Sequence, residues 1–126
     1  MEVLPITFNF DLFSRITASV YRQMESPFSL EEVLDIFYYF FSAYEEATGE
    51  MHPGIRRDQI RQIIEIMPYS SRDGAGFDSK VIDFSPDDYP YMIDAYFATE
   101  FAYCNYRINH FFSGQIRELR YYEECY

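Results

Sequence analysis

The chain has 126 residues, a net charge of −11 from 21 acidic and 10 basic residues, and 13 tyrosines and 13 phenylalanines but no tryptophan. Its length suits one domain that buries its own core without disulfides or metal. The acidic excess argues against direct binding to nucleic acid or to an anionic membrane, and two cysteines are too few for a disulfide framework. We therefore expect one soluble, cytoplasmic domain over 1–126, with reduced cysteines.

The first elements are an arm and a helix. Residues 1–8 contain a proline and predict an extended arm. Apolar residues then recur at helical spacing, which predicts a helix from Asn9 or Asp11 to Met24. These apolar residues are Leu12, Phe13, Ile16, Val20 and Met24.

The next helix has the strongest signals in the chain. Ser29 and Glu32 have the spacing of a capping box, in which the hydroxyl accepts a backbone N–H and the carboxylate reaches back to the cap. Gly49 predicts the end, so the helix is expected over 30–47. Its apolar stripe comprises Leu30, Val33, Leu34, Phe37, Phe40, Phe41 and Tyr44. The opposite side comprises Glu31, Asp35, Tyr38, Tyr39, Ser42, Glu45 and Glu46.

A turn at 52–54 leads to a further helix, which ends at Pro68. Its apolar stripe comprises Ile55, Ile60, Ile63, Ile64 and Met67. Residues 68–88 are rich in Gly, Ser, Asp and Pro and predict a long loop, with a short strand or hairpin near 77–84.

The last long helix is expected to begin at Asp87 or Asp88, with Pro90 in its first turn, and to continue to Gly114. The apolar residues that keep helical spacing over this length are Met92, Ile93, Tyr96, Phe97, Phe101, Cys104, Ile108 and Phe111. Residues 115–122 predict a short final helix or a frayed end. Together these elements predict an all-α fold, a compact single-domain bundle of four to five helices.

The negative charge is concentrated in two segments. Residues 25–50 hold seven acids and no base, and residues 68–100 hold seven acids and two bases, whereas the rest of the chain is close to neutral. In the first segment the acids share the solvent face of the helix over 30–47. At i, i+4 spacing, like charges repel by a few tenths of a kcal/mol per pair. No Lys or Arg on this helix relieves that repulsion.

This acidic face has two interpretations. It can serve only to keep an aromatic-rich protein soluble. It can also present negative charge to a basic partner surface, where complementary charge speeds association and selects partners. Tyrosines beside the acids favour contact with a protein, since tyrosine is enriched in interfaces. The predicted partner-binding residues are Glu31, Asp35, Tyr38, Tyr39, Glu45, Glu46, Asp73, Asp78 and Asp83.

Arg56, Arg57 and Arg61 form a small basic cluster at the start of the helix that precedes Pro68. Cations are disfavoured in a first helical turn, so internal ion pairs with the neighbouring acidic segment are the simpler interpretation. The alternative is an anion clamp for a phosphate or for a partner carboxylate.

Catalytic signals are weak. His52 and His110 belong to no metal-ligand spacing and are interpreted as turn or helix-face residues. Cys104 lies six residues before His110, on another face of the expected helix, and is interpreted as a small core residue. The sequence predicts no metal, no cofactor and no enzymatic activity, although a site assembled from distant residues stays open.

The sequence therefore predicts a small acidic protein that docks its acidic, tyrosine-rich helical face onto a basic surface of a nucleic-acid-binding protein, and so inhibits or regulates it. Such a face would imitate a phosphate backbone. In composition, though in no aligned motif, the chain is similar to inhibitors encoded by phages and other mobile elements, anti-CRISPR and DNA-mimic proteins among them. The alternative is a homodimeric structural or regulatory module that buries its surplus aromatics between two copies.

Overall fold

The computed structural model of the chain describes residues 10–69, 84–100 and 105–112. Within these ranges the chain forms five α-helices and one 3₁₀ turn: α1 (Phe10–Tyr21), α2 (Leu30–Thr48), α3 (Arg57–Ile66), η1 (Pro86–Asp88), α4 (Tyr89–Ala98) and α5 (Ile108–Phe111). The predicted all-α fold is confirmed. The predicted arm at 1–8, nearly all of the segment at 77–84 and everything after Gly114 lie outside the described residues.

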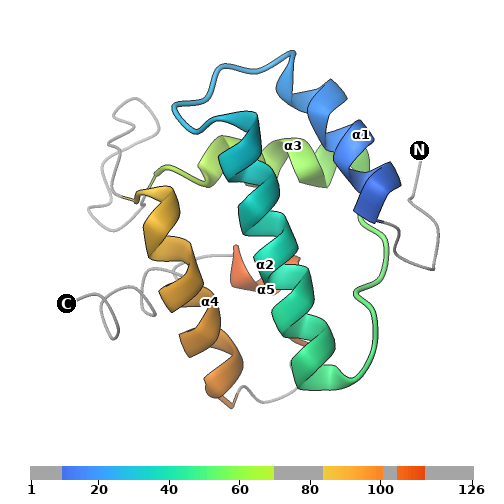
Figure 1. The fold of residues 1–126 in the computed structure, drawn as a ribbon, viewed down its shortest axis with the longest axis vertical. Coiled ribbons are helices and arrows are strands. Elements are labelled where there is room, and N and C mark those ends of the chain that lie inside the picture. The colour runs from blue at the N-terminus through green and yellow to red at the C-terminus, as the bar shows by residue number, and fades with distance from the viewer. Residues whose placement is uncertain (1–9, 70–83, 101–104, 113–126) are drawn as a thin grey trace.

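The helices are arranged around α2. Figure 1 shows α2 and α4 side by side with the same chain direction, and these two helices are in contact. Helix α1 packs against both α3 and α2, and α5 reaches α2 through Phe111, whose ring centroid lies 5.5 Å from that of Phe40. None of the described helices combines the length and the apolar composition needed to cross a bilayer.

Both ends of α2 form as predicted. The Ser29 hydroxyl accepts from the Glu32 backbone N–H at 3.1 Å, and the Glu32 carboxylate accepts from the Ser29 N–H at 2.8 Å. At the other end Gly49 has a φ of 77°, in the left-handed region, and its N–H bonds the Glu45 carbonyl at 2.8 Å. Glycine adopts this conformation without steric cost, which explains the helix end.

The core is largely aromatic. Phe13 of α1 packs edge-on against Phe37 and Phe41 of α2, with ring centroids 4.9 and 5.2 Å apart. Tyr89 and Tyr96 of α4 are also fully buried, and their hydroxyls bond the Met67 carbonyl and His110 Nδ1, respectively. Buried phenols need such partners, so this core is specified by hydrogen bonds as well as by shape.

The predicted apolar stripe of α2 is correct at five positions. Val33, Phe37, Phe40, Phe41 and Tyr44 are buried. Leu30 and Leu34 are only half-buried, whereas Ile36, which the prediction omitted, is 4% exposed.

The predicted continuous helix to Gly114 is wrong. Helix α4 ends at Ala98, and the backbone of Thr99 is extended. The Thr99 side-chain hydroxyl donates to the Ala95 carbonyl at 2.8 Å. Tyr106 has a φ of 58° and donates its hydroxyl to the Thr99 carbonyl at 2.7 Å. Residues of α5 are therefore buried by folding back against the core and not by extending α4.

The start of α4 differs in detail from its prediction. Asp88 stands at the cap position and Pro90 lies in the first turn, as expected, but no side-chain cap bond is made there. The Asp88 carboxylate instead accepts from the Ser85 N–H at 2.9 Å and stabilises η1, which precedes the helix.

Candidate protein-binding surface

The solvent face of α2 carries one exposed stripe. At 100° per residue, Glu31, Asp35, Tyr38, Ser42 and Glu45 lie within a narrow arc of the helix, and all five are exposed. We call these five residues the acidic stripe. The acids are not evenly spaced, because Asp35 and Glu45 are ten positions, or about 15 Å along the axis, apart. The stripe is therefore two acidic ends with Tyr38 and Ser42 between them.

The two ends differ in their relation to the helix dipole. Glu31 lies in the first turn, where a negative charge is favourable. Glu45 and the neighbouring exposed Glu46 lie in the last turn, where the dipole disfavours acids, and no base lies there. The C-terminal acids are thus placed where they lower the stability of the helix.

Tyr39 does not belong to the stripe. It is half-buried, and its hydroxyl donates to Asp94 Oδ1 of α4 at 2.7 Å. Partial burial, the hydrogen bond to Asp94 and the negative charges of Asp94 and Glu46 raise the pKa of Tyr39 to about 12. This tyrosine therefore keeps its proton and links α2 to α4, which makes it a structural residue in this arrangement.

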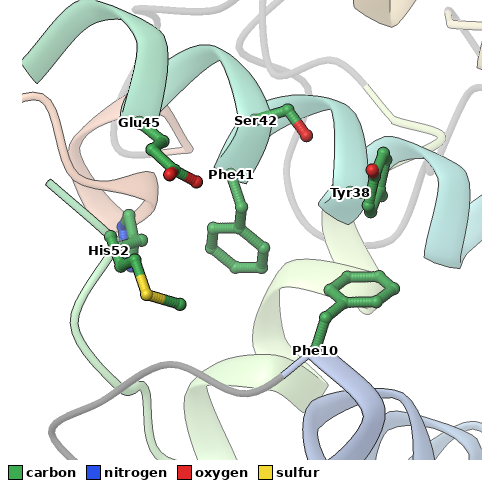
Figure 2. A pocket seen from close by; sticks show the side chains of 7 residues that line it. Phe10, Tyr38, Phe41, Ser42, Glu45 and His52 are labelled. Atoms are coloured by element: carbon green, nitrogen blue, oxygen red, sulfur yellow. The ribbon is translucent and has the colours of Figure 1, made fainter. Parts of the chain in front are cut away.

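A pocket of about 150 Å³ lies beside the C-terminal half of the stripe. Figure 2 shows Phe10 of α1 across this pocket from the side chains of α2. The lining residues are Phe10, Tyr38, Phe41, Ser42, Glu45, Met51 and His52. The pocket is open to solvent, since Tyr38 is 59% and Met51 49% exposed. It joins an aromatic wall to an acidic rim.

His52 also lines this pocket, and its side chain is buried, with only 2% exposed. Its ring lies 4.8 Å from the rings of both Phe41 and Tyr44. Nδ1 donates to the Pro53 carbonyl at 2.7 Å, and Nε2 accepts from the Ile108 N–H at 3.0 Å. A carbonyl only accepts and a backbone N–H only donates, so this geometry requires the neutral ring.

Burial lowers the pKa of His52 to about 4, and the positive charge of Arg107 adds to this effect against the opposing Pro53 hydrogen bond. His52 is therefore uncharged at neutral pH and has both nitrogens engaged. His52 lies in an irregular segment between α2 and α3, and its interpretation as a turn or helix-face residue missed its burial and its contact with α5.

The arginine cluster is engaged locally. Arg56 Nε lies 3.2 Å from Asp58 Oδ1, and Arg57 donates to Ser19 Oγ of α1 at 2.7 Å. Arg57 and Arg61 are exposed. The sequence predicts ion pairs between this cluster and the acidic segment over 25–50. Arg56 instead pairs with Asp58 at the start of α3, because Asp58 is the nearer carboxylate along the chain.

Other predicted residues lie elsewhere. Asp73, Asp78, Asp83 and Cys104 are outside the described ranges. His110 is half-buried and bonded to Tyr96. Over 10–69, 84–100 and 105–112, no group of three His, Cys, Asp or Glu side chains is placed to hold a metal ion.

Of the seven residues that line the pocket, the predicted binding residues include only Tyr38 and Glu45 and omit Phe10, Phe41, Ser42, Met51 and His52. Phe10 and Tyr38 meet edge-on with centroids 5.1 Å apart although 28 positions separate them in the chain. Only the packing of α1 against α2 brings them together, and no local pattern encodes it. No family model, curated protein or solved structure compared with the chain gives a match.

Proposed function

We propose that the chain is a small acidic binding protein, not an enzyme, that docks the acidic stripe of α2 and the adjacent Glu46 onto a basic surface of a nucleic-acid-binding protein. The consequence would be inhibition or regulation of that protein by competition for its groove. The observation that carries the proposal is the exposed acidic face of a helix without a single Lys or Arg, set on a packed aromatic core.

The length and the charge of the face fit a partial imitation of nucleic acid. From Glu31 to Glu45 the stripe spans about 21 Å of helix axis. One DNA strand carries a phosphate about every 3.4 Å, or roughly six over that length. The stripe has three acids within this length and Glu46 directly after it, which is about half to two-thirds of the charge of one strand. We therefore expect the helix to fill part of a basic groove.

The position of Glu45 and Glu46 also supports the proposal. Solubility alone would be served by acids anywhere on the surface, including sites that stabilise the helix. Two acids in the last turn of α2 oppose the dipole. Residues that break a local rule without a compensating contact are often found at functional sites.

The test is capture of partners from the cells that make this protein, with the immobilised chain as bait. Duplex DNA should displace the captured proteins, and reversal of four acids to lysine should abolish capture: Glu31→Lys, Asp35→Lys, Glu45→Lys and Glu46→Lys. The matched control reverses four exposed acids outside α2: Glu25→Lys, Glu65→Lys, Asp87→Lys and Glu100→Lys.

The control changes the net charge by the same amount, so it separates a specific face from overall charge. Capture that survives the α2 reversals, or that is lost equally in the control, would contradict the proposal. A steep loss of binding with added salt is also expected, since surface charge is screened within about 10 Å at 0.1 M.

A homodimer is the second candidate. The exposed side chains of Tyr38, Met51 and Tyr91 favour it, because large apolar groups in solvent are often covered by a second copy. Light scattering over a range of concentrations measures whether the chain forms a stable dimer. If that dimer buries the α2 face, the face cannot bind another protein, and the homodimer replaces the first candidate.

A further inference from the structure

The pocket beside the acidic stripe has room for one side-chain head. A cavity of about 150 Å³ in a protein holds a group the size of benzene. Sites for cofactors and drug-sized molecules are larger, at about 300–1,000 Å³. With a volume of about 150 Å³, the pocket suits a single side chain of a partner more than a free metabolite.

The walls of the pocket favour a cation. Phe10, Tyr38 and Phe41 provide aromatic surface, whose electron-rich faces attract cations. Helical side chains lean toward the N-terminus, so Glu45 leans over Phe41 and Ser42, one turn earlier. A carboxylate thus stands at the rim of an aromatic wall, as Figure 2 shows.

No lining residue opposes a positive charge. His52 is the basic side chain in the lining, and its two nitrogens are occupied by Pro53 and Ile108, which holds it neutral. The charge within the lining is negative, because Glu45 is its one ionised residue and α2 carries no base, while the positive charge of Arg107 acts on His52 from outside the lining. A neutral head could gain a hydrogen bond from Glu45 but no ion pair, and an anionic head would be repelled.

We propose that this pocket receives the guanidinium of one arginine from the basic partner, packed against the aromatic wall and paired with Glu45. Arginine fits better than lysine, because its planar head stacks on rings and is less strongly hydrated. The inference rests on the proposed function and deepens it: the acidic stripe attracts the basic surface, and the pocket fixes one residue of that surface in register.

The probe is the tripeptide acetyl-Gly-Arg-Gly-amide, titrated into the full chain and followed by NMR at the Met51 methyl group and the Tyr38 amide. Counterparts with lysine and with citrulline, a neutral isostere of arginine, are titrated in parallel. We expect saturable shifts with arginine, weaker ones with lysine, and the weakest with citrulline, which keeps hydrogen-bond donors but has no charge. Equal shifts from arginine and citrulline, or none from arginine, would overturn the proposal.

A matched pair of variants separates the pocket from general charge. Glu45→Gln and Glu46→Gln each remove one exposed acid from the last turn of α2, but only Glu45 lines the pocket. We expect Glu45→Gln to weaken peptide binding about fivefold and Glu46→Gln less than twofold. Equal losses would overturn the pocket proposal.

The same variants distinguish this failure from that of the proposed function. If the four-lysine variant of α2 loses its partner while Glu45→Gln and Glu46→Gln behave alike, the acidic stripe stands and the pocket does not. If the peptide binds as expected but the partner ignores the four reversals, the proposed function fails and the cation pocket remains. A dimer that buries Tyr38 overturns the assignment of an arginine to this pocket.

Discussion

At its N-terminal end α2 begins with a complete capping box and with Glu31 and Glu32 in the first turn, whereas its C-terminal end places Glu45 and Glu46 against the dipole. The C-terminal end nevertheless holds its shape, because Phe40, Phe41 and Tyr44 surround the buried His52. Local interactions stabilise one end and tertiary packing the other. The acids that lower stability lie where packing tolerates them.

The largest test of this difference is His52→Ala. We expect the free energy of unfolding to fall by about 3 kcal/mol at pH 7, because a packed ring is lost and the Ile108 N–H is left without its acceptor. Urea denaturation followed by circular dichroism measures the loss. A change below 1 kcal/mol would contradict the dependence of the C-terminal end on this residue.

The pH dependence of the same residue provides a second measurement. The pKa of His52 falls from 6.5 to about 4 on folding, so between these values the unfolded chain binds more protons and acid destabilises the fold. Above pH 6.5 the stability that the fold gains from holding His52 neutral is present in full. Acidification to pH 4 removes about 3 kcal/mol of it. In His52→Gln, which cannot titrate, the loss between pH 7 and pH 4 should be smaller by that amount.

Ser29→Ala tests the other end of α2. Without the hydroxyl that accepts from the Glu32 N–H, we expect a loss of about 1 kcal/mol in unfolding free energy. Ser42→Ala is the control, since Ser42 is an exposed serine in the helix interior, and it should leave stability unchanged or slightly higher. Equal effects of the two substitutions would show that the capping box contributes nothing.

Glu45→Lys combined with Glu46→Lys should act in the opposite direction. Replacing two acids by bases in the last turn should raise the free energy of unfolding by about 1 kcal/mol at low salt, and less at high salt. Glu31→Lys should bring no gain, because it removes a favourable charge from the first turn. A double variant less stable than the natural chain would mean that these acids hold the helix end in another way.

Tyr39→Phe should have the smallest effect. It removes the hydrogen bond to Asp94 between α2 and α4, and we expect a loss of about 0.5 kcal/mol, since the site is half-exposed. Ultraviolet titration should at the same time lose a phenol whose pKa is about 12. Tyr38→Phe, at an exposed position, is the control and should leave stability unchanged.

The accuracy of the sequence-based predictions follows the range of the interactions. Helix α2 was predictable because Ser29, Glu32 and Gly49 act on their own neighbours. The end of α4 was not, because no Gly or Pro marks Thr99 and because the apolar spacing suits a longer helix equally well. The fold back onto the core depends on Tyr106 and α5, whose contacts are made only in the folded protein.

The candidate surface shows the same division. The exposed acids of α2 could be placed from helical periodicity alone. The pocket could not, since it needs Phe10 from α1 and His52 from beyond the helix. Tyr39 shows the remaining error: periodicity placed it near the acids, but the adjacent α4 provides Asp94 as a partner that sequence spacing cannot reveal.

The bond from the Ile108 N–H to His52 has a consequence for the dynamics of α5. The first amides of a helix usually exchange quickly with solvent because no carbonyl within the helix accepts from them, and a four-residue helix offers no other protection. In this chain the acceptor is a side chain 56 residues earlier. Deuterium uptake at Ile108 should therefore be slow, and its rate should report how often α5 detaches from the rest of the protein.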